Sequence, residues 1–321
     1  MTQAIVRKTI MKSIDELSHA WSSMDENRMA FIVIETSHPL NFHIGYAAPK
    51  QKCFVVENTG EIENIVSSKG IAVRCMPISN GIGLQFVLLT PQLEDLFVKL
   101  CWNLIDASNG PSEGAVDRLV MEYRNWQRLL QQERPHILTS MQQKGLIAEL
   151  LFLSELIDRV GSNSALQSWT GPEGSDQDFD FPQYWAEIKA TSLASDKVQI
   201  SSLQQLDRCD SGVLAVYRMD KTTAHGIHSL TLEEAINTVK AKISSQHERD
   251  VFECKLLKHG ILSGHYQRSS DRFKVLKKLL YNVTSDFPKL TPGNTPAGVV
   301  EAKYSISLAS IASFLNEEVD L

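Results

Sequence analysis

Four charged side chains stand in two short segments that otherwise look like core strands. Asp178 and Asp180 alternate with phenylalanines in "DFDF", and Glu187 and Lys189 flank Ile188 in "YWAEIKAT". Because side chains alternate across a strand, each charged pair occupies one face and its apolar neighbours occupy the other. Two such strands side by side place acids and a lysine around a polar pocket at the edge of a core, where a cation could bind. The exposed face of a half-buried antiparallel strand shows the same alternation, so both interpretations stay open at this point.

An acid on the preceding helix fits the same pocket. Residues 140–160 have helical apolar spacing, and Gly161 after them favours a helix end. The inward stripe consists of Leu146, Leu150, Leu153 and either Leu156 or Ile157. Glu149 falls on the flank of this stripe, whereas Glu155 points away from it. A carboxylate near a core is costly unless it is paired, so a neighbouring cation-binding pocket explains Glu149; an acid that reaches water at the stripe's edge is the alternative.

The elements around these residues follow a regular order. After the helix at 140–160 and a turn-rich loop at 169–177, the pattern predicts strands at 178–181 and 184–191, a helical segment at 201–207 and an apolar strand at 212–219. Helices at 230–243 and 248–260 follow, and the residues after 260 look mostly extended. The order from residue 140 to 219 is therefore helix, strand, strand, helix, strand.

The first part of the chain predicts a smaller α+β unit. It opens with an amphipathic helix that carries Ile10, Ile14, Leu17 and Trp21 at helical spacing. Strands are expected at 28–36 and 81–90, and a helix is expected at 91–108, with a proline at its start. A second long helix at 116–132 could connect the halves. The expected organisation is an α+β domain at 1–110, a connecting helix at 111–135 and a second domain at 136–321.

Composition indicates a soluble globular protein. The 321 residues are 43% hydrophobic and 22% charged, which excludes fibrous and disordered classes. The chain shows no secretory leader and no apolar run of roughly 18 to 20 residues, so we expect a cytoplasmic protein with no membrane partner. The five scattered cysteines form no C-x-x-C pair and are expected to be buried, reduced thiols. The net charge of -6 argues against a uniformly basic coat for nucleic acid, although not against a local basic patch.

The ordered series of segments resembles a known nuclease core. A helix with Glu149, a strand with Asp178, a strand with Glu187 and Lys189, then a helix and an apolar strand resemble the layout of the PD-(D/E)XK nucleases. More narrowly, the chain resembles a little-characterised bacterial family of PD-(D/E)XK proteins that is associated with anti-phage defence genes. The segments that carry this resemblance are "GLIAELLFL", "WTGPEGSDQDFDF", "WAEIKAT", "QISSLQQLD", "RFKVLKKLLYNV" and "DFPKLTPGNTPAGVVEAKYSISL".

The resemblance implies a mixed α/β fold. Behind the N-terminal α+β unit, it predicts a restriction-endonuclease-like αβββαβ core with further helices and strands after it. The chain departs from the family pattern at one point, because Gln177 precedes Asp178 where the pattern has proline. The acid pair leaves open whether Asp178 or Asp180 is the metal ligand, and the "DF" of the family pattern favours Asp178.

The resemblance also implies a chemistry. Asp178 and Glu187 would bind Mg2+, with Mn2+ as a substitute, helped by the backbone carbonyl of Ile188. Lys189 would orient the nucleophile and add positive charge near the transition state, and Glu149 would hold a metal-bound water or a second ion. The implied protein is a metal-dependent nuclease, an endonuclease-type hydrolase, with DNA favoured over RNA because of the association with antiviral defence.

A binding module is the second interpretation. A nuclease fold can serve as a silent scaffold or sensor in a defence or DNA-repair complex, in which partner proteins of the system would bind it. For the enzyme, cutting both strands with one site per chain requires two copies or two successive events, so a homodimer is compatible with the sequence. A local basic surplus lies between His265 and Lys289, where six Lys or Arg residues stand against two acids. Four of them are expected to contact phosphates, or else to form a solvated helix face: Arg272, Lys274, Lys277 and Lys278.

Several other polar residues carry weaker signals. Gln205 and Ser202 could touch the phosphate or Lys189, but Ser202 also suits a helix cap and Gln205 a surface position. The histidines expected to be ordinary loop residues are His38, His43, His225 and His228, of which the last two form an H-x-x-H without an obvious third ligand.

Overall fold

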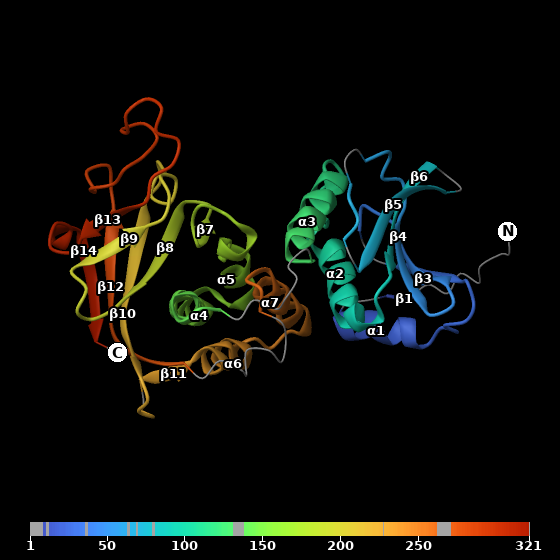
Figure 1. The fold of residues 1–321 in the computed structure, drawn as a ribbon, viewed down its shortest axis with the longest axis horizontal. Helices are drawn as coiled ribbons and strands as arrows, with labels where there is room; N and C mark the ends of the chain where they lie inside the picture. Colours follow the sequence, from blue (N-terminus) through green and yellow to red (C-terminus); the bar gives the residue numbers. More distant parts are fainter. Residues whose placement is uncertain are drawn as a thin grey trace. The chain divides into compact units, whose positions relative to one another are not determined.

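The chain folds into two compact units, Met1–Arg134 and Pro135–Leu321, each built around a β-sheet (Figure 1). The structure, a computed structural model, describes residues 9–10, 13–35, 38–62, 65–68, 70–78, 81–130, 138–226, 228–261 and 271–320. Both units combine helices with strands, so the predicted mixed α/β class is confirmed.

The first unit contains a six-stranded sheet in the order β1-β2-β3-β4-β6-β5. Its strands are β1 (Thr9–Ile10), β2 (Phe31–Glu35), β3 (Phe42–Ala48), β4 (Gln51–Val56), β5 (Ile71–Ile78) and β6 (Gly81–Leu88). Only the β1-β2 pair among them is parallel. The expected strands at 28–36 and 81–90 correspond to β2 and β6, whereas β3, β4 and β5 are additional.

Three helices cover one face of this sheet (Figure 1). They are α1 (Ile14–Ser22), α2 (Glu94–Ala107), which follows the 3-10 turn η1 (Pro91–Leu93), and α3 (Ala115–Leu130). Helix α1 begins later than the amphipathic pattern predicts, because Ser13 accepts the Glu16 amide as a cap and Ile10 belongs to β1. The structure places α3 inside the first unit, where Trp126 Nε1 donates to Asn103 Oδ1 of α2 at 2.5 Å.

The second unit is built on a mixed sheet in the order β11-β12-β10-β8-β7, with β14 paired to β12. Its strands are β7 (Phe179–Phe181), β8 (Tyr184–Thr191), β10 (Gly212–Thr222), β11 (Ser229–Thr231), β12 (Arg272–Val283) and β14 (Leu315–Asp320). Strands β8 and β10 run parallel, and the other pairs are antiparallel. Strand β10 is central and covered on both faces, which explains its continuous apolar sequence.

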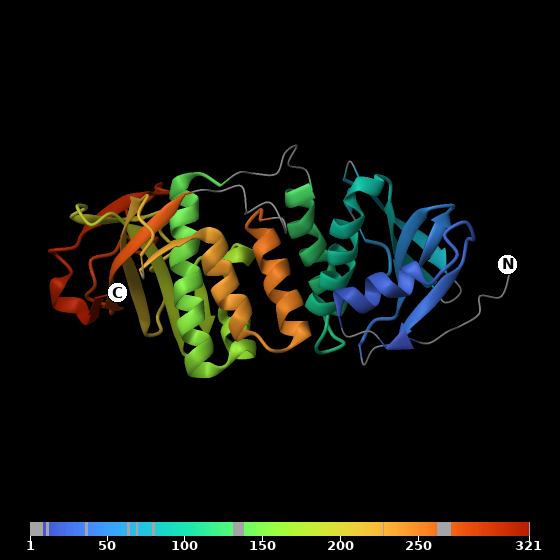
Figure 2. The ribbon, with the colours of Figure 1, turned by 90° about the horizontal axis from the view of Figure 1, so that it is seen from below.

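Different layers cover the two faces of this sheet. One face packs against α4 (Ser140–Val160), α5 (Ser162–Ser168), α6 (Leu232–Lys242) and α7 (Gln246–Lys258), of which α4, α6 and α7 lie side by side in Figure 2. The other face packs against the β-ladder of β9 (Lys197–Ile200) and β13 (Tyr304–Ser307) and the turn η4 (Ala312–Phe314). Helix α4 starts at a capping box of Thr139 and Gln142 and ends at Gly161, as the sequence predicts.

The connection between the parallel strands β8 and β10 differs from the expectation. Residues 201–207 were expected to form a helix but form turns. Ser202 Oγ accepts the Gln205 amide at 3.3 Å and Asp207 N donates to Gln204 O at 3.0 Å, which is the length of a single turn. The αβββαβ series therefore has a turn in place of its second helix.

The cysteines are all free. Cys53, Cys101 and Cys254 are buried and Cys75 is partly buried, but Cys209 is exposed, so the expectation of burial is wrong for Cys209. Among the described residues, no helix combines the length and the apolar character needed to cross a membrane.

Candidate active site

Asp178 lies immediately before β7 and is fixed against β8. Its Oδ2 accepts a hydrogen bond from the amide of Ile188 at 2.7 Å. Its backbone carbonyl accepts the amides of Thr170 and Gly171 at 2.9 and 3.0 Å. Because Phe179 pairs with Ala186 in the β7-β8 ladder, the register brings Asp178 beside Glu187.

Glu187 and Lys189 occupy the same face of β8 and touch each other. Lys189 Nζ donates to Glu187 Oε1 at 2.5 Å and to Gln205 Oε1 at 3.1 Å. The Glu187 side chain has 0% exposure, and its Oε2 has no hydrogen-bond partner among the described residues. Since buried polar atoms are normally paired, this oxygen is available for a ligand that the protein itself does not supply.

Glu149 reaches the same place from α4. Its Oε2 accepts a hydrogen bond from Trp169 Nε1 at 2.9 Å. A Cβ atom built at Gly171, in the short turn η2 (Gly171–Glu173), would lie 3.1 Å from Asp178 Oδ1 and 3.4 Å from Glu149 Oε2. Gly171 therefore leaves space beside Asp178 Oδ1, which the Cβ of a larger residue would crowd.

Asp180 lies apart from this cluster. Its Oδ1 accepts from Arg208 at 2.6 Å, and 44% of its side chain is exposed. The two acids of "DFDF" therefore have different surroundings, with Asp178 beside Glu187 and Glu149 and with Asp180 paired to a guanidinium.

Burial dominates the electrostatics of the carboxylates, and their mutual repulsion adds to it. Burial raises the pKa of Asp178 well above its ordinary value, and the charges of Glu187 and Glu149 raise it further. Burial also raises the pKa of Glu187 to about 7, although Lys189 opposes this shift. For Lys189, burial lowers the pKa, but Glu187 and Asp178 outweigh it, so its pKa is raised and the ammonium stays charged. A bound cation would relieve the repulsion.

The donor set fits a hard divalent cation. In the part of the chain that the structure describes, no three or more His, Cys, Asp or Glu side chains gather to hold a metal ion by themselves. Mg2+ needs fewer, because it is commonly bound by one or two carboxylates together with waters and substrate phosphate oxygens. Asp178 and Glu187 supply two, and the unpaired Oε2 of Glu187 is the observation that supports the fit.

Gln205 links the cluster to the β8-β10 connection. Its Oε1 accepts both Lys189 Nζ at 3.1 Å and the amide of Ser201 at 2.8 Å, so the turn fixes the side chain that contacts the lysine. From the sequence, Gln205 was expected either to touch the phosphate or Lys189 or to lie at the surface. In the structure it contacts Lys189. Ser202 Oγ caps only the turn itself.

Three residues of the site were not singled out in the sequence. Trp169 and Gly171 stand in the turn-rich loop "WTGPEG", whose signals are its position just before the acids and its place in the segment "WTGPEGSDQDFDF" that resembles the family. His259 follows α7, and its Nε2 lies 3.5 Å from Glu149 Oε2. Its separation from the acids along the chain explains why the sequence gives no hint of it.

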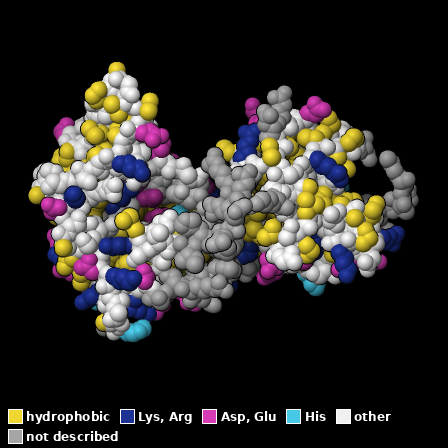
Figure 3. Space-filling view, viewed as in Figure 1, with side chains coloured by type: hydrophobic (Ala, Val, Ile, Leu, Met, Phe, Trp, Pro, Cys, Tyr) yellow, Lys and Arg dark blue, Asp and Glu magenta, His cyan; other side chains and the backbone are white. Residues whose placement is uncertain are grey.

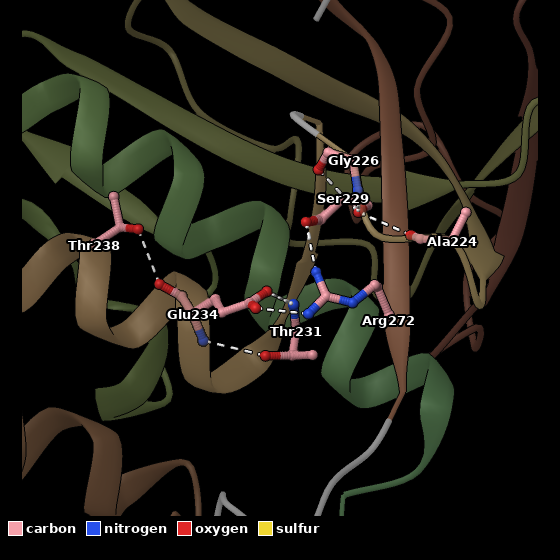
Figure 4. Close-up of polar contacts among 7 residues, drawn as sticks. All are labelled: Ala224, Gly226, Ser229, Thr231, Glu234, Thr238 and Arg272. Atoms are coloured by element: carbon pink, nitrogen blue, oxygen red, sulfur yellow. Dashed lines mark hydrogen bonds and ion pairs between the residues drawn. The ribbon is translucent and has the colours of Figure 1, made fainter.

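The basic segment lies on a strand, and most of its side chains have acidic partners. Its residues are Arg272, Lys274, Lys277 and Lys278. They lie on strand β12, not on a helix, and β10 separates them from β8, so the structure does not bring them to the acids. Arg272 donates to Ser229 O at 2.7 Å and to Glu234 Oε1 at 2.6 Å, which joins β12 to the start of α6 (Figure 4).

Two lysines of this segment also have acidic partners. Lys277 pairs with Glu318, and Lys278 is buried in an ion pair with Glu155. Lys274 is exposed. On the face drawn in Figure 3, basic side chains are interspersed with acidic ones. Of these four residues, three therefore have their positive charge balanced by an acid. Arg268 of the same basic stretch lies outside the described residues.

His38 and His43, both expected in a loop, have partners for their side chains, and His43 lies on β3. His38 Nδ1 accepts the amide of Leu40 at 2.9 Å, and its Nε2 lies 2.9 Å from the carbonyl of Ile105. His43 pairs with Glu57 Oε1 at 2.7 Å. Burial lowers the pKa of His38, because it disfavours the charged form of the ring.

Comparison with known proteins gives one result. The model of a family described as "Putative PD-(D/E)XK family member, (DUF4420)" matches residues 17–309. The match spans most of both units and includes all four acids and the lysine discussed above. Searches of the curated proteins and of the solved structures found no match.

Proposed function

Because the chain belongs to this PD-(D/E)XK family, we propose that it is a metal-dependent nuclease that hydrolyses phosphodiester bonds of nucleic acid, DNA in preference to RNA. The observation that carries the proposal is the fully buried Glu187, with one oxygen on Lys189 and the other unpaired beside Asp178. Burying a carboxylate with an unsatisfied oxygen is costly, and a structural role does not require it. The proposed context is bacterial antiviral defence in the cytoplasm, with partner proteins or a second copy of the chain.

Asp178 and Glu187 are the proposed ligands of Mg2+ or Mn2+. When bound, such an ion neutralises charge on the scissile phosphate and makes its bound water more acidic. The protein's part is to hold the two carboxylates at one place before the ion arrives. The amide of Ile188 fixes Asp178, and burial on β8 fixes Glu187.

Lys189 supplies the permanent positive charge of the site. Its raised pKa keeps it protonated at neutral pH, and Gln205 directs its ammonium. A cation held in place next to the reacting phosphate stabilises the extra negative charge of the transition state. Glu149, held by Trp169 and close to Gly171, is proposed to orient the attacking water.

The test is a cleavage assay with matched variants. The purified protein is incubated with supercoiled plasmid, linear duplex, single-stranded DNA and RNA in Mg2+, in Mn2+ and in EDTA, beside Glu187→Ala and Lys189→Ala. Lys197→Ala, an exposed lysine on β9, is the control. We expect cleavage that needs metal, is lost in the two site variants and persists in the control. Site variants that cut like the parent would disprove the assignment. Absence of both cleavage and Mn2+ binding would favour the alternative function, a silent scaffold or sensor in a defence or DNA-repair complex.

A further inference from the structure

We propose that His259 is a positioning residue for the acid site: together with Trp169, it holds the carboxylate of Glu149 beside Asp178. This inference rests on the proposed function, because it gives Glu149 a reason to be held. His259 comes from the end of α7, outside the strands that carry the acids. Neither the family match nor the sequence pattern assigns it a role.

The imidazole of His259 is aimed at Glu149. Its Nε2 is buried, has no hydrogen-bond partner among the described residues and lies 3.5 Å from Glu149 Oε2. The Glu149 side chain is 13% exposed and that of His259 is 23% exposed. Burying a ring nitrogen without a close partner is unfavourable unless the nitrogen interacts with a neighbouring polar group. The carboxylate of Glu149 is the acid that it faces.

Trp169 forms the other half of this clamp. Its indole Nε1 donates to the same Glu149 Oε2 at 2.9 Å. Its fully buried ring stacks on the imidazole, with ring centroids 5.6 Å apart and an interplanar angle of 29°, and packs against Phe252 of α7. One carboxylate oxygen is therefore approached by two nitrogens whose rings fix each other.

The end of α7 is anchored to the loop that carries the indole. Lys255 Nζ donates to the carbonyl of Trp169 at 2.6 Å and to Glu173 Oε1 at 2.8 Å, and Lys258 lies 3.7 Å from the same Glu173 oxygen. These contacts tie α7 to residues 169–173, which also border Asp178. His259 and Trp169 consequently keep their positions together, as one support behind Glu149.

His259 and Trp169 are needed because Glu149 lies in a cluster of acids that repel one another. Glu149 adds to the repulsion that raises the pKa of both Asp178 and Glu187, so a freely rotating glutamate would turn towards water. Groups behind a catalytic carboxylate that fix its orientation typically change activity or metal affinity by about 10- to 100-fold when removed. We expect this range for the loss of the His259 nitrogen.

The experiment compares variants that separate the stacking of His259 on Trp169 from the polar contact of its Nε2 with Glu149. His259→Phe keeps an aromatic ring on Trp169 and removes Nε2. His259→Gln instead removes the ring and supplies a side-chain amide that can contact Glu149. Glu149→Gln and the double variant with His259→Phe complete a mutant cycle, and the exposed His225→Phe is the control. Measurements are kcat and KM on the DNA substrate that the parent cuts, thermal unfolding, and the 1H-15N signal of the Trp169 indole, identified among five tryptophans by Trp169→Phe.

The expected result is specific to positioning. His259→Phe lowers kcat about 10- to 100-fold with little change in KM or unfolding temperature, His259→Gln recovers most of this loss, and His259→Phe adds nothing in the Glu149→Gln background. A parent that cuts DNA and a His259→Phe variant with the same kcat would overturn the inference while leaving the nuclease in place. So would equal effects of His259→Phe with and without Glu149.

The indole signal decides the matter even if the parent cuts nothing. In that case the proposed function fails, but the clamp is still observable. A His259→Phe variant whose Trp169 signal moves as it does in Glu149→Gln supports the clamp, because the indole then loses the same carboxylate. An unmoved signal overturns it.

Discussion

The amide of Ile188 donates to Asp178 Oδ2 at 2.7 Å, so the residue between Glu187 and Lys189 fixes the acid of the neighbouring strand. A single backbone N–H thereby sets the spacing of the two carboxylates. Because the hydrogen bond comes from the main chain of β8, any shift of β7 along β8 would break it. The ladder register and the site geometry are consequently one feature of the fold.

Metal ions should stabilise the protein through Asp178. Ligand that binds only the folded state adds about 2.7 kcal/mol at a concentration 100 times Kd, and a divalent cation also removes the carboxylate repulsion. We expect Mn2+ to raise the unfolding temperature of the parent and of Asp180→Asn, whose aspartate pairs with Arg208 instead. Asp178→Asn should show no such rise. The reverse order in a thermal shift assay would identify Asp180 as the ligand.

Gln205 should matter for cleavage, whereas its neighbour should not. Gln205→Leu removes the oxygen that holds Lys189 Nζ, and we expect kcat to fall about 10- to 100-fold. Gln204→Leu changes an exposed side chain in the same turn and should leave kcat unchanged. Single-turnover cleavage measures both. Equal rates for the two variants would mean that Lys189 needs no partner.

The pH dependence of stability should include a contribution from Glu173. Burial raises its pKa, but Lys255 and Lys258 outweigh this effect, so the folded-state pKa is lowered. A lowered acid pKa stabilises the fold above the unfolded value and loses this stabilisation as pH falls through the folded value. Because 39% of the side chain is exposed, solvent screening keeps the effect below about 1 kcal/mol.

Glu173→Gln provides the measurement for this contribution. The difference in urea midpoint between parent and Glu173→Gln should be largest near neutral pH and should shrink between about pH 5 and pH 3. A difference that stays constant over this range would show that the Glu173 contacts do not depend on its charge.

Two glycine variants should have opposite effects on stability. A Cβ at Gly212 would lie 2.0 Å from Trp185 Cε2, so Gly212→Ala must displace a buried indole on β8 and should cost about 1–3 kcal/mol. Gly145, within α4, has no neighbour within 4 Å of such a Cβ. Gly145→Ala should stabilise the protein by about 0.5–1 kcal/mol, because alanine is the better helix former. Chemical denaturation measures both variants, and stabilisation by Gly212→Ala would contradict this packing.

Charge reversal on β12 should separate folding from nucleic-acid binding. Lys278→Glu places two acids together in a buried pair with Glu155 and should destabilise the fold by more than about 3 kcal/mol. Lys274→Glu changes an exposed residue and should alter stability by no more than about 0.5 kcal/mol. If β12 nevertheless contacts DNA, Lys274→Glu will weaken binding at low salt. Unchanged affinity would remove this strand from the binding surface.

The sequence predicts long, strongly patterned elements well. Helix α4 and strand β8 have the expected bounds, because a capping box, a terminal glycine and a clear alternation mark their ends. Strands β3, β4 and β5 were not predicted, since their pairing depends on neighbours in the sheet. The predicted helix at 201–207 is a single turn. Ser202 caps this turn by accepting the Gln205 amide, but too few residues remain for a helix before β10 begins at Gly212.

The site was predictable where residues recur at strand or helix spacing. Glu149, Asp178, Glu187 and Lys189 were all expected to share one pocket, and the structure brings them together. The contribution of His259 depends on how α7 packs after the core strands, which local pattern cannot reveal. The ion pairs of the basic segment could not be predicted either, because its acidic partners come from other parts of the chain.

The β9-β13 ladder has a consequence for synthesis on the ribosome. Ile200 of β9 pairs with Tyr304, about a hundred residues later, and Ser201 and Gln205 follow directly after β9. Translation proceeds at about 5–20 residues per second, so β13 is synthesised on the order of 5–20 s after β9. During that interval the turn that holds Lys189 has no finished support. A nascent chain therefore contains every acid of the site before the strand that completes the β9-β13 ladder has been made.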